Sequence, residues 1–333
     1  MTADGRSSIR VVRVHELVGP SGLRVDEISV PAAGPGEVLI DVKAAGVNFP
    51  DLLLSHGKYQ FKPEPPFVPG GEVAGVVRAV GTGVASVAPG DRVASTMIHG
   101  GYAEVVAVPE ATVIKIGPTV SFEVAAATLL TYCTTLHALV DRAGLGARSE
   151  TLLVLGAAGG VGTAAVELGK LLGARVIAAA STDEKVAFCK EHGADAGICY
   201  GREDLKAQVK ALTGGNGADV IYDPVGGSLS EPALRSIAWE GRYLVVGFAA
   251  GEIPKIPLNL ALLKGCQIVG VFWGSFAMRE PQRNRAHAVR IFAWIEEGKL
   301  RPHVDAVLPF AQAGEALERM ARREVKGKIV LVP

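Results

Sequence analysis

The sequence predicts an α/β protein in which a doubly wound parallel sheet is inserted into a second, β-rich domain. Short β-type runs separated by Gly and Pro dominate residues 9–120, whereas apolar strands alternate with helical segments from about residue 125. The tail then mixes helix and strand without extending the wound sheet. The expected division is the first part of one domain over 1–126, the wound domain over 127–274, and the returning part of the first domain over 275–333.

The first segment reads as the strands of a compact, barrel-like domain. Each run is short and rich in Val and Ile, and each ends at turn-forming residues. The runs are IRVVRV (9–14), EVLIDVKAAGV (37–47), EVAGVVRAVG (72–81), DRVAST (91–96), YAEVVAV (102–108) and TVIKI (112–116).

The second segment contains six apolar strands with helices between them, which is the full count of a dinucleotide-binding domain. Helices are expected at 161–172, 184–192 and 258–264, the last with a buried stripe at Leu258, Ala261 and Leu262. The strands are TLLVLG (151–156), RVIAAAS (175–181), AGICY (196–200), DVIYDPV (219–225), GRYLVVG (241–247) and CQIVGVFW (266–273).

The tail reads as a return to the first domain. It contains an amphipathic helix near 284–297, the β-type run DAVLPF, a helix near 311–322 and the strand KIVLV.

Composition narrows the class of partner. The 333 residues are 49% hydrophobic, enough for a large core, and 34 Lys and Arg balance 34 Asp and Glu. A net charge of zero removes the electrostatic case for nucleic acid or an anionic membrane, so a small-molecule partner is expected. The polar start MTADGRSS and the lack of a membrane-length apolar stretch predict a cytosolic protein. Four scattered cysteines without a CxxC pair suggest neither disulfides nor a cysteine-built zinc site.

The stretch LLVLGAAGGVGTAAVELG carries a phosphate-binding turn in a strand–turn–helix context. It departs from GxGxxG because Ala157 occupies the first glycine position. Glycines in the turn still let backbone amides approach a pyrophosphate at a helix N-terminus. An isolated glycine cluster is often only a turn, but this context favours dinucleotide binding. The residues of the predicted loop are Gly156, Ala158, Gly159, Gly160, Val161 and Gly162.

The end of the second strand indicates which dinucleotide binds. An NAD site requires Asp or Glu about 20 residues past the loop, whereas this chain has Ser181 at the strand tip. Asp183 falls where the first turn of the next helix begins. Ser181 could bond a 2′-phosphate, and Lys185 could add charge or could be an ordinary solvated helix residue. NADPH is therefore the predicted cofactor.

Several segments in this order resemble the medium-chain dehydrogenase/reductase superfamily, in its zinc-independent quinone oxidoreductase branch. The resemblance covers nearly the whole chain. It implies a GroES-like β-barrel catalytic domain split around a Rossmann domain, an active site in the cleft between them, and a homodimer in which CQIVGVFW pairs as an edge strand. The segments are VKAAGVNFPDLL, PGGEVAGVV, GDRVA, LLTYCTTLHAL, the AAGGVG turn and GKIVLV.

The resemblance also implies that no metal is bound. Zinc-containing relatives carry Cys-x-x-Asp and Gly-His-Glu segments, whereas here Asn48 stands at the cysteine position, with Asp51 in place, and Gly71 at the histidine position. The third ligand position is Thr131. A catalytic zinc needs about three protein ligands, and the four-cysteine structural lobe is missing as well.

Without a Lewis acid, the enzyme is suited to reducing an electrophilic acceptor. The nicotinamide of NADPH would pass a hydride to a quinone, or to the β-carbon of an enone, and hydrogen-bond donors would meet the developing oxyanion. Asn48 is the first candidate donor, or else a turn residue in GVNFPD. Tyr59 matches a substrate-facing tyrosine of the family, or else is a surface aromatic. Asp51 is expected to orient the Asn48 loop, and Glu72 to be a backbone-bonded structural carboxylate.

The leading hypothesis is an NADPH:quinone oxidoreductase of the EC 1.6.5 class. The alternatives are a reductase of activated C=C bonds in enals, enones or enoyl-CoA, and a non-enzymatic NADPH-binding protein. The resemblance further implies substrate-lining Phe49 and Phe61, and cofactor contacts at Thr135, Tyr200, Val225, Gly226, Gly247, Phe248, Phe272, Trp273 and Lys328.

Overall fold

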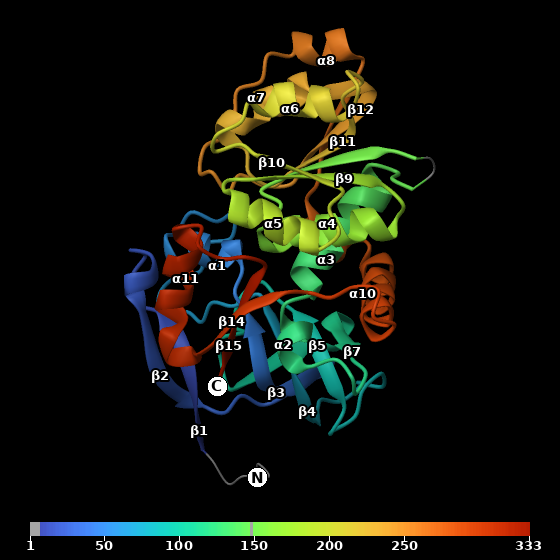
Figure 1. Ribbon diagram of the computed structural model, residues 1–333. Coiled ribbons are helices and arrows are strands. Elements are labelled where there is room, and N and C mark those ends of the chain that lie inside the picture. The colour runs from blue at the N-terminus through green and yellow to red at the C-terminus, as the bar shows by residue number, and fades with distance from the viewer. Residues whose placement is uncertain (1–6, 147–148) are drawn as a thin grey trace. The chain divides into compact units, whose positions relative to one another are not determined.

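The computed structural model describes residues 7–146 and 149–333, and internal contacts divide the chain into two compact units (Figure 1). Unit 1 comprises Met1–Leu130, Ala288–Glu297 and Pro302–Pro333, and unit 2 comprises Thr131–His287 and Gly298–Arg301. The helices α3 (Leu129–Leu136) and α10 (Pro281–Glu296) each continue from one unit into the other. The boundaries expected from sequence, after residues 126 and 274, lie earlier in the chain than these.

Unit 2 is built on a six-stranded sheet in the order β10-β9-β8-β11-β12-β13, and every pairing is parallel. This is the strand order 3-2-1-4-5-6 of dinucleotide-binding domains, so the predicted wound sheet is confirmed. The strands are β8 (Thr151–Leu155), β9 (Arg175–Ala180), β10 (Ala196–Cys199), β11 (Ala218–Asp223), β12 (Ile237–Val245) and β13 (Gln267–Gly270).

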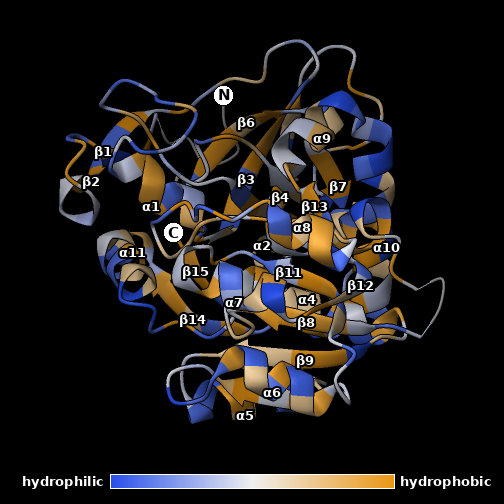
Figure 2. Cartoon of the chain, turned by 90° about the horizontal axis from the view of Figure 1, so that it is seen from above, coloured by the Kyte–Doolittle hydropathy of each residue, from blue (hydrophilic) through white to orange (hydrophobic). Residues whose placement is uncertain are grey.

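Helices cover both faces of this sheet, with α4 and α5 on one face and α6 and α7 on the other (Figure 1). Because both faces are covered, the strands are apolar throughout, and β8 and β9 are among the most hydrophobic segments in Figure 2. Leu153, Ile177 and Ile221 are fully buried in the core between them. The helices of the unit are α4 (Gly160–Leu171), α5 (Asp183–Glu191), α6 (Leu205–Leu212), α7 (Ser230–Arg235), α8 (Asn259–Lys264) and α9 (Trp273–Arg279).

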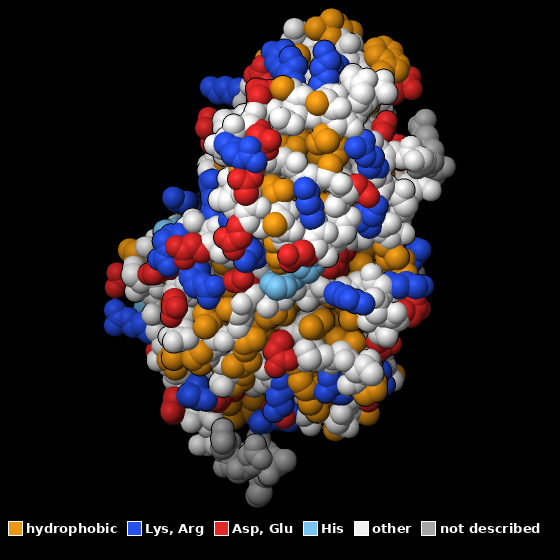
Figure 3. Space-filling view, viewed as in Figure 1, with side chains coloured by type: hydrophobic (Ala, Val, Ile, Leu, Met, Phe, Trp, Pro, Cys, Tyr) orange, Lys and Arg blue, Asp and Glu red, His pale blue; other side chains and the backbone are white. Residues whose placement is uncertain are grey.

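One sequence prediction for unit 2 is wrong. The expected buried stripe on α8 is exposed, since Leu258 and Leu262 are 78% and 80% accessible, and Leu260 is the buried residue of that helix. The helix is too short to present a full stripe, and its apolar side faces outward. Figure 3 shows hydrophobic atoms on the surface at the end of unit 2 that carries α8.

Unit 1 is the β-rich unit. Its main sheet has the order β14-β15-β3-β4-β5-β7, with β6 paired to β3, and a separate antiparallel pair is formed by β1 and β2. These pairings form an open path, and closure into a barrel stays a prediction. The strands are β1 (Ser8–Val14), β2 (Leu23–Ser29), β3 (Glu37–Gly46), β4 (Glu72–Val80), β5 (Arg92–Thr96), β6 (Val105–Pro109), β7 (Val113–Lys115), β14 (Val304–Pro309) and β15 (Lys328–Val332).

The tail completes unit 1, as the sequence predicted. β15 pairs antiparallel with β3 through Val330 opposite Gly46, although these residues are nearly the whole chain apart. β2 is not among the predicted strands, because its side chains are largely accessible and it lacks the apolar pattern of its neighbours. The helices of the unit are α1 (Phe49–Ser55), α2 (Phe122–Ala126) and α11 (Ala313–Ala321). Unit 1 also has single turns of 3-10 helix at Pro20–Gly22, Glu110–Thr112 and Phe310–Gln312, whereas unit 2 has one at Gly227–Leu229 and a π-helical turn at His137–Arg142.

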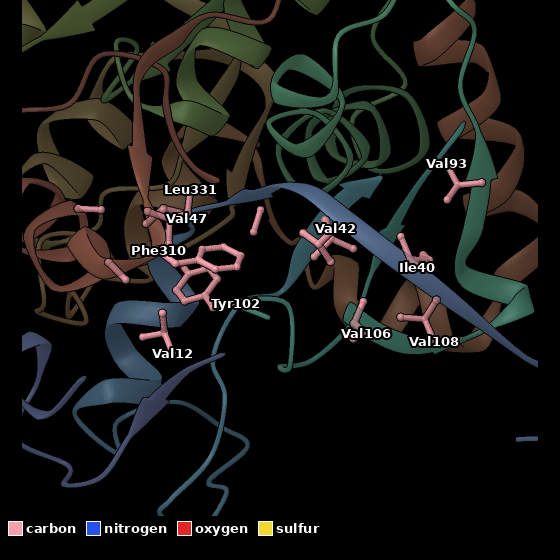
Figure 4. Packing of buried hydrophobic residues seen from close by; sticks show 14 of the residues in the cluster. Val12, Ile40, Val42, Val47, Val93, Tyr102, Val106, Val108, Phe310 and Leu331 are labelled. Carbon is pink, nitrogen blue, oxygen red and sulfur yellow. The ribbon is translucent and has the colours of Figure 1, made fainter. Parts of the chain in front are cut away.

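The core of unit 1 joins the beginning and the end of the chain. Tyr102 and Phe310 lie together beside Val47 and Leu331 (Figure 4), and all four are buried. Tyr102 is one of the largest fully buried side chains, so its hydroxyl must find a partner inside the protein. That partner belongs to the candidate site.

Candidate functional site

A buried polar network lies where β3 leads into α1. The backbone N–H of Asn48 donates to Asp51 Oδ2 at 2.8 Å, which closes the first turn of α1. Asp51 also accepts from the Tyr102 hydroxyl at 2.9 Å and from the Gly70 N–H at 3.2 Å. Complete burial raises the pKa of Asp51 from 3.8 to about 6, although these hydrogen bonds and Lys328 act in the opposite direction. Asp51 therefore fastens the start of α1 to the strand segments beside it.

Glu72, the first residue of β4, is a second buried carboxylate of this network. Its Oε1 accepts from the Leu130 N–H at 3.0 Å, and its Oε2 accepts from Asn48 Nδ2 at 3.2 Å. Burial raises its pKa, and the nearby Lys328 ammonium partly offsets that rise. This is the backbone-bonded arrangement expected for Glu72.

Lys328 brings the third charge into the network from β15. Its ammonium donates to the Val47 carbonyl at 2.7 Å and to Asn48 Oδ1, and it lies 3.6 Å from Glu72 Oε2. The residue is only 5% exposed, and burial lowers its pKa while the two carboxylates act to raise it. The cofactor contact expected of Lys328 has no support in this geometry, because its three donors face the interior of unit 1.

The side chain of Asn48 is fully used inside the same network. Its amide nitrogen donates to the Gly46 carbonyl at 3.3 Å and to Glu72, and its oxygen accepts from Lys328. An amide has two N–H donors, so none is left for a substrate oxygen. The expected role of Asn48 as an oxyanion donor therefore also lacks geometric support.

Aromatic side chains lie on the neighbouring loops of unit 1. Tyr59 packs against the small cluster of Val14, Leu54 and Phe67, and its phenol has no hydrogen bond within the described part of the chain. Burial, assisted by the negative charge of Asp51, raises the pKa of Tyr59 above 10, so the phenol keeps its proton at neutral pH. Phe49 is half-buried against the core.

Phe61, which is 43% exposed, stacks on His99 with 5.5 Å between the ring centroids. His99 is not among the site residues predicted from the sequence, although its place directly before Gly100 and Gly101 is a local signal for such a residue.

The phosphate loop forms in unit 2 as the sequence indicates. β8 ends before Gly156, which has a φ of +57°, and Gly159 precedes the first residue of α4 in an extended conformation. A Cβ on Gly162 would lie 2.2 Å from the Gly156 carbonyl oxygen, so only glycine fits there. The first N–H groups of α4 and its dipole provide an anion site next to a turn that only small residues can form. These residues fit a dinucleotide pyrophosphate.

The tip of β9 carries Ser181, as predicted, and Thr182 caps α5 by accepting from the Lys185 N–H at 3.3 Å. Asp183 begins α5, and its carboxylate pairs with Arg202 at 2.7 Å on an exposed surface. Arg202 is not among the residues predicted from the sequence. It follows the third strand in the segment GRED, and the order of the sheet places it beside the end of the second strand.

The remaining expected cofactor residues follow the carboxyl ends of the strands of this sheet. Asp223 ends β11, and its Oδ1 accepts from the N–H groups of Val225 and Gly226 at 2.8 and 2.9 Å. The Thr135 hydroxyl lies 3.0 Å from the Tyr222 hydroxyl and 3.3 Å from the Val161 carbonyl, which ties it to the start of α4. Tyr200 follows β10, Gly247 and Phe248 follow β12, and Phe272 and Trp273 stand at the start of α9.

Two family comparisons match separate parts of the chain. Residues 34–118 match the alcohol dehydrogenase GroES-like domain, and residues 160–292 match the zinc-binding dehydrogenase family. A quinone oxidoreductase-like protein 2 homolog of Nematostella vectensis is 41% identical over 330 residues, covering 98% of this chain and 90% of that protein. The chain belongs to the quinone oxidoreductase branch of the medium-chain dehydrogenase/reductase superfamily.

Two further relatives are similar to this chain over nearly their full length. Human quinone oxidoreductase is 33% identical, with 99% of both chains covered. A mycobacterial protein solved in complex with NADPH is 32% identical, with a TM-score of 0.90 and coverage of 98% of this chain and 100% of that one. The predicted family is confirmed, as is the fold of a Rossmann sheet with a GroES-like domain, and the chain is an oxidoreductase of this family.

The residues of this branch member do not fit a catalytic zinc ion. Gly71 offers no ligand, the Asn48 amide is already hydrogen-bonded, and the Lys328 ammonium would repel a cation. Among the described residues, no group of three or more His, Cys, Asp or Glu side chains is placed to hold a metal. In the same part of the chain, every helix is too short or too polar to cross a membrane.

Proposed function

We propose that the protein is an NADPH-dependent quinone reductase that works without a metal. The observation that carries this proposal is the buried Asn48–Lys328–Glu72 network, in which Asn48 stands at a position that the family resemblance assigns to a zinc ligand and is bonded to the Lys328 ammonium. A site with an ammonium in place of a Lewis acid is poorly equipped to ionise an alcohol and better suited to an acceptor that is already electrophilic. The human relative is named a quinone oxidoreductase, and two related structures contain NADPH.

Bound NADPH would supply the hydride, and the residues of this chain hold and orient the reactants. The N-terminus of α4 would bind the pyrophosphate, since its amides are unpaired and its dipole favours an anion. Ser181, Lys185 and Arg202 would take the 2′-phosphate. The Tyr59 phenol keeps its proton and would donate a hydrogen bond to the oxygen on which charge develops.

The test is a panel of acceptors with NADPH and NADH. Purified protein is assayed for NADPH oxidation at 340 nm with 1,4-benzoquinone, 9,10-phenanthrenequinone, a 2-alkenal and crotonyl-CoA, before and after treatment with a chelator. We expect turnover of quinones, a preference for NADPH, and no loss of rate after chelation. Turnover of the alkenal or crotonyl-CoA alone would move the assignment to activated C=C bonds. Binding of NADPH without turnover of any acceptor would indicate a non-enzymatic protein.

We also propose that the protein is a homodimer formed through β13. This strand is at the edge of the sheet in unit 2 and pairs with β12 on one side only. Exposed apolar side chains are found on and near it: Trp239, Leu258, Leu262, Leu263 and Ile268. Sedimentation equilibrium of wild type and of a Leu262→Asp, Leu263→Asp variant tests the proposal. A wild-type monomer at micromolar concentration would refute it.

A further inference from the structure

The loop that carries His99 is attached to the wall of the buried network in unit 1. It leaves β5 with the Met97 N–H donating to the Gly71 carbonyl at 3.0 Å, and the Gly101 N–H donates to the Gly70 carbonyl at 2.9 Å. Gly70 in turn donates to Asp51, and Glu72 follows Gly71 directly. The position of His99 is therefore set by the segment that also positions the two buried carboxylates.

The imidazole of His99 is held between two phenyl rings. Phe61 lies nearly parallel to it, with 17° between the planes, and Phe67 meets it edge-on with 6.2 Å between centroids. Phe67 is buried and belongs to the cluster against which Tyr59 packs. His99 and Tyr59 thus contact the same buried ring from two different loops.

The two ring nitrogens of His99 differ in their surroundings. Nδ1 is buried and has no hydrogen-bond partner among the described residues. His99 as a whole is partly exposed, and Nε2 forms no hydrogen bond within the described part of the chain. Nδ1 lacks a partner in either neutral tautomer, as an unpaired donor or as an unpaired acceptor. The neutral ring has a single N–H, and with that proton on Nε2 the ring presents a hydrogen-bond donor.

We propose that His99 is a second hydrogen-bond donor to the acceptor carbonyl, with Nε2–H directed at the oxygen that becomes negative. The inference rests on the proposed quinone reductase function. Hydride addition transfers two electrons and one hydrogen from NADPH to the quinone, giving NADP⁺ and the hydroquinone anion, and a proton from solvent then completes the hydroquinone. Nε2–H and the Tyr59 phenol stabilise the anion before that proton arrives. Asn48 cannot take this part, because its amide is fully bonded.

Two substitutions separate this role from packing. His99→Phe keeps a ring stacked on Phe61 and removes the N–H, whereas His99→Gln removes the ring and keeps an amide donor. Loss of one oxyanion donor costs about 10²–10³ in kcat, so we expect His99→Phe to lower kcat for 1,4-benzoquinone by about 100-fold. We expect His99→Gln to keep a larger share of the wild-type kcat. The Kd for NADPH, measured by fluorescence titration, should change less than about twofold in both variants, because unit 2 holds the predicted cofactor contacts.

The matched control is His15→Gln, which alters a histidine of the same unit that pairs with Asp26 at 2.9 Å. It should keep the wild-type kcat. The proposal is overturned if His99→Phe retains the wild-type kcat, or if both His99 variants lose kcat equally together with a lower Tm, since a packing role would produce that result. A wild-type protein that reduces no acceptor would overturn the proposed function itself. An active wild type together with an equally active His99→Phe would overturn only the role of His99.

Discussion

Replacing Lys328 with Met should destabilise unit 1 far more than the loss of an ordinary ion pair. The substitution keeps most of the apolar stem and removes the ammonium from the Val47 carbonyl, Asn48 Oδ1 and Glu72. Two carboxylates then remain buried without a cation. Breaking a buried pair by removing one partner costs about 3–5 kcal/mol, because the remaining charge is left uncompensated. Against a total stability of about 5–15 kcal/mol, this is a large fraction.

The measurement is denaturant-dependent hydrogen exchange followed by mass spectrometry, which reports the opening free energy of individual peptides. Peptides covering β3, β4 and β15 should lose about 3–5 kcal/mol of protection in Lys328→Met, the cost of breaking a buried ion pair. Peptides from the sheet of unit 2 should be unchanged. The control is Lys115→Met in the same sheet, which breaks an exposed ion pair with Asp91 and should have little effect.

A double substitution tests the cause of the loss. Glu72→Gln removes one of the two negative charges that Lys328 compensates, so Lys328→Met with Glu72→Gln should be less destabilised than the sum of the single variants. Coupling between contacting residues is about 0.5–3 kcal/mol. Additive effects, or a Lys328→Met variant as stable as Lys115→Met, would refute the assignment of a buried charge network.

Three further predictions concern the carboxylate, the loop and the cofactor. The folded-state pKa of Asp51 is raised from 3.8 to about 6, so the folded protein holds a proton that the unfolded chain releases, and stability falls as pH rises through that window. At 1.36 kcal/mol per pKa unit, the loss of stability amounts to about 3 kcal/mol. In urea unfolding, the difference in free energy of unfolding between wild type and Asp51→Asn should therefore become smaller from pH 4 to pH 7. Parallel pH profiles of the two proteins would contradict this prediction. Gly162→Val should weaken NADPH binding at least about tenfold, because its Cβ would clash with the Gly156 carbonyl. Gly159→Ala should lose less affinity, because a Cβ at that position lies 3.4 Å from the same oxygen. Equal Kd values of the two variants in fluorescence titration would exclude this reasoning. Arg202→Ala should lower the ratio of kcat/KM with NADPH to that with NADH about tenfold, since a charge-assisted bond to phosphate contributes about 1.5–3 kcal/mol; an unchanged ratio would exclude Arg202 from the 2′-phosphate site.

The wound sheet could be predicted because its signals are local. A parallel strand covered on both faces is apolar throughout, and the turn after β8 combines glycines with the start of a helix in a short segment. The stripe on α8 was wrongly predicted as buried. Leucines at helical spacing predict an apolar helix face, but they do not predict which part of the protein packs against that face. Leu258 and Leu262 are exposed.

The network could be predicted only in its local half. Asn48 and Asp51 are three residues apart, and the capping arrangement at the start of α1 follows from that spacing. Lys328 is 280 residues from Asn48 in the sequence, and nothing in the segment GKIVLV indicates what the ammonium faces. The contact depends on the register of β15 against β3, which places Val330 opposite Gly46 and so brings Lys328 beside Asn48. Long-range pairing of this kind is not encoded in a local pattern.

On the proposal that the protein works without a metal, the network gives a physical reason why the site stays ordered. A zinc ion holds its ligands in place through coordination bonds, and in its absence the same backbone segments need another source of order. Here Asp51 fixes the start of α1 and the Gly70 turn, and Glu72 fixes the beginning of β4 to Leu130. Lys328 supplies the positive charge that two buried carboxylates require, and it does so from the last strand of the chain. The cation thereby joins the last strand to Val47, Asn48 and Glu72, while in the proposed mechanism the neutral donors Tyr59 and His99 polarise the carbonyl.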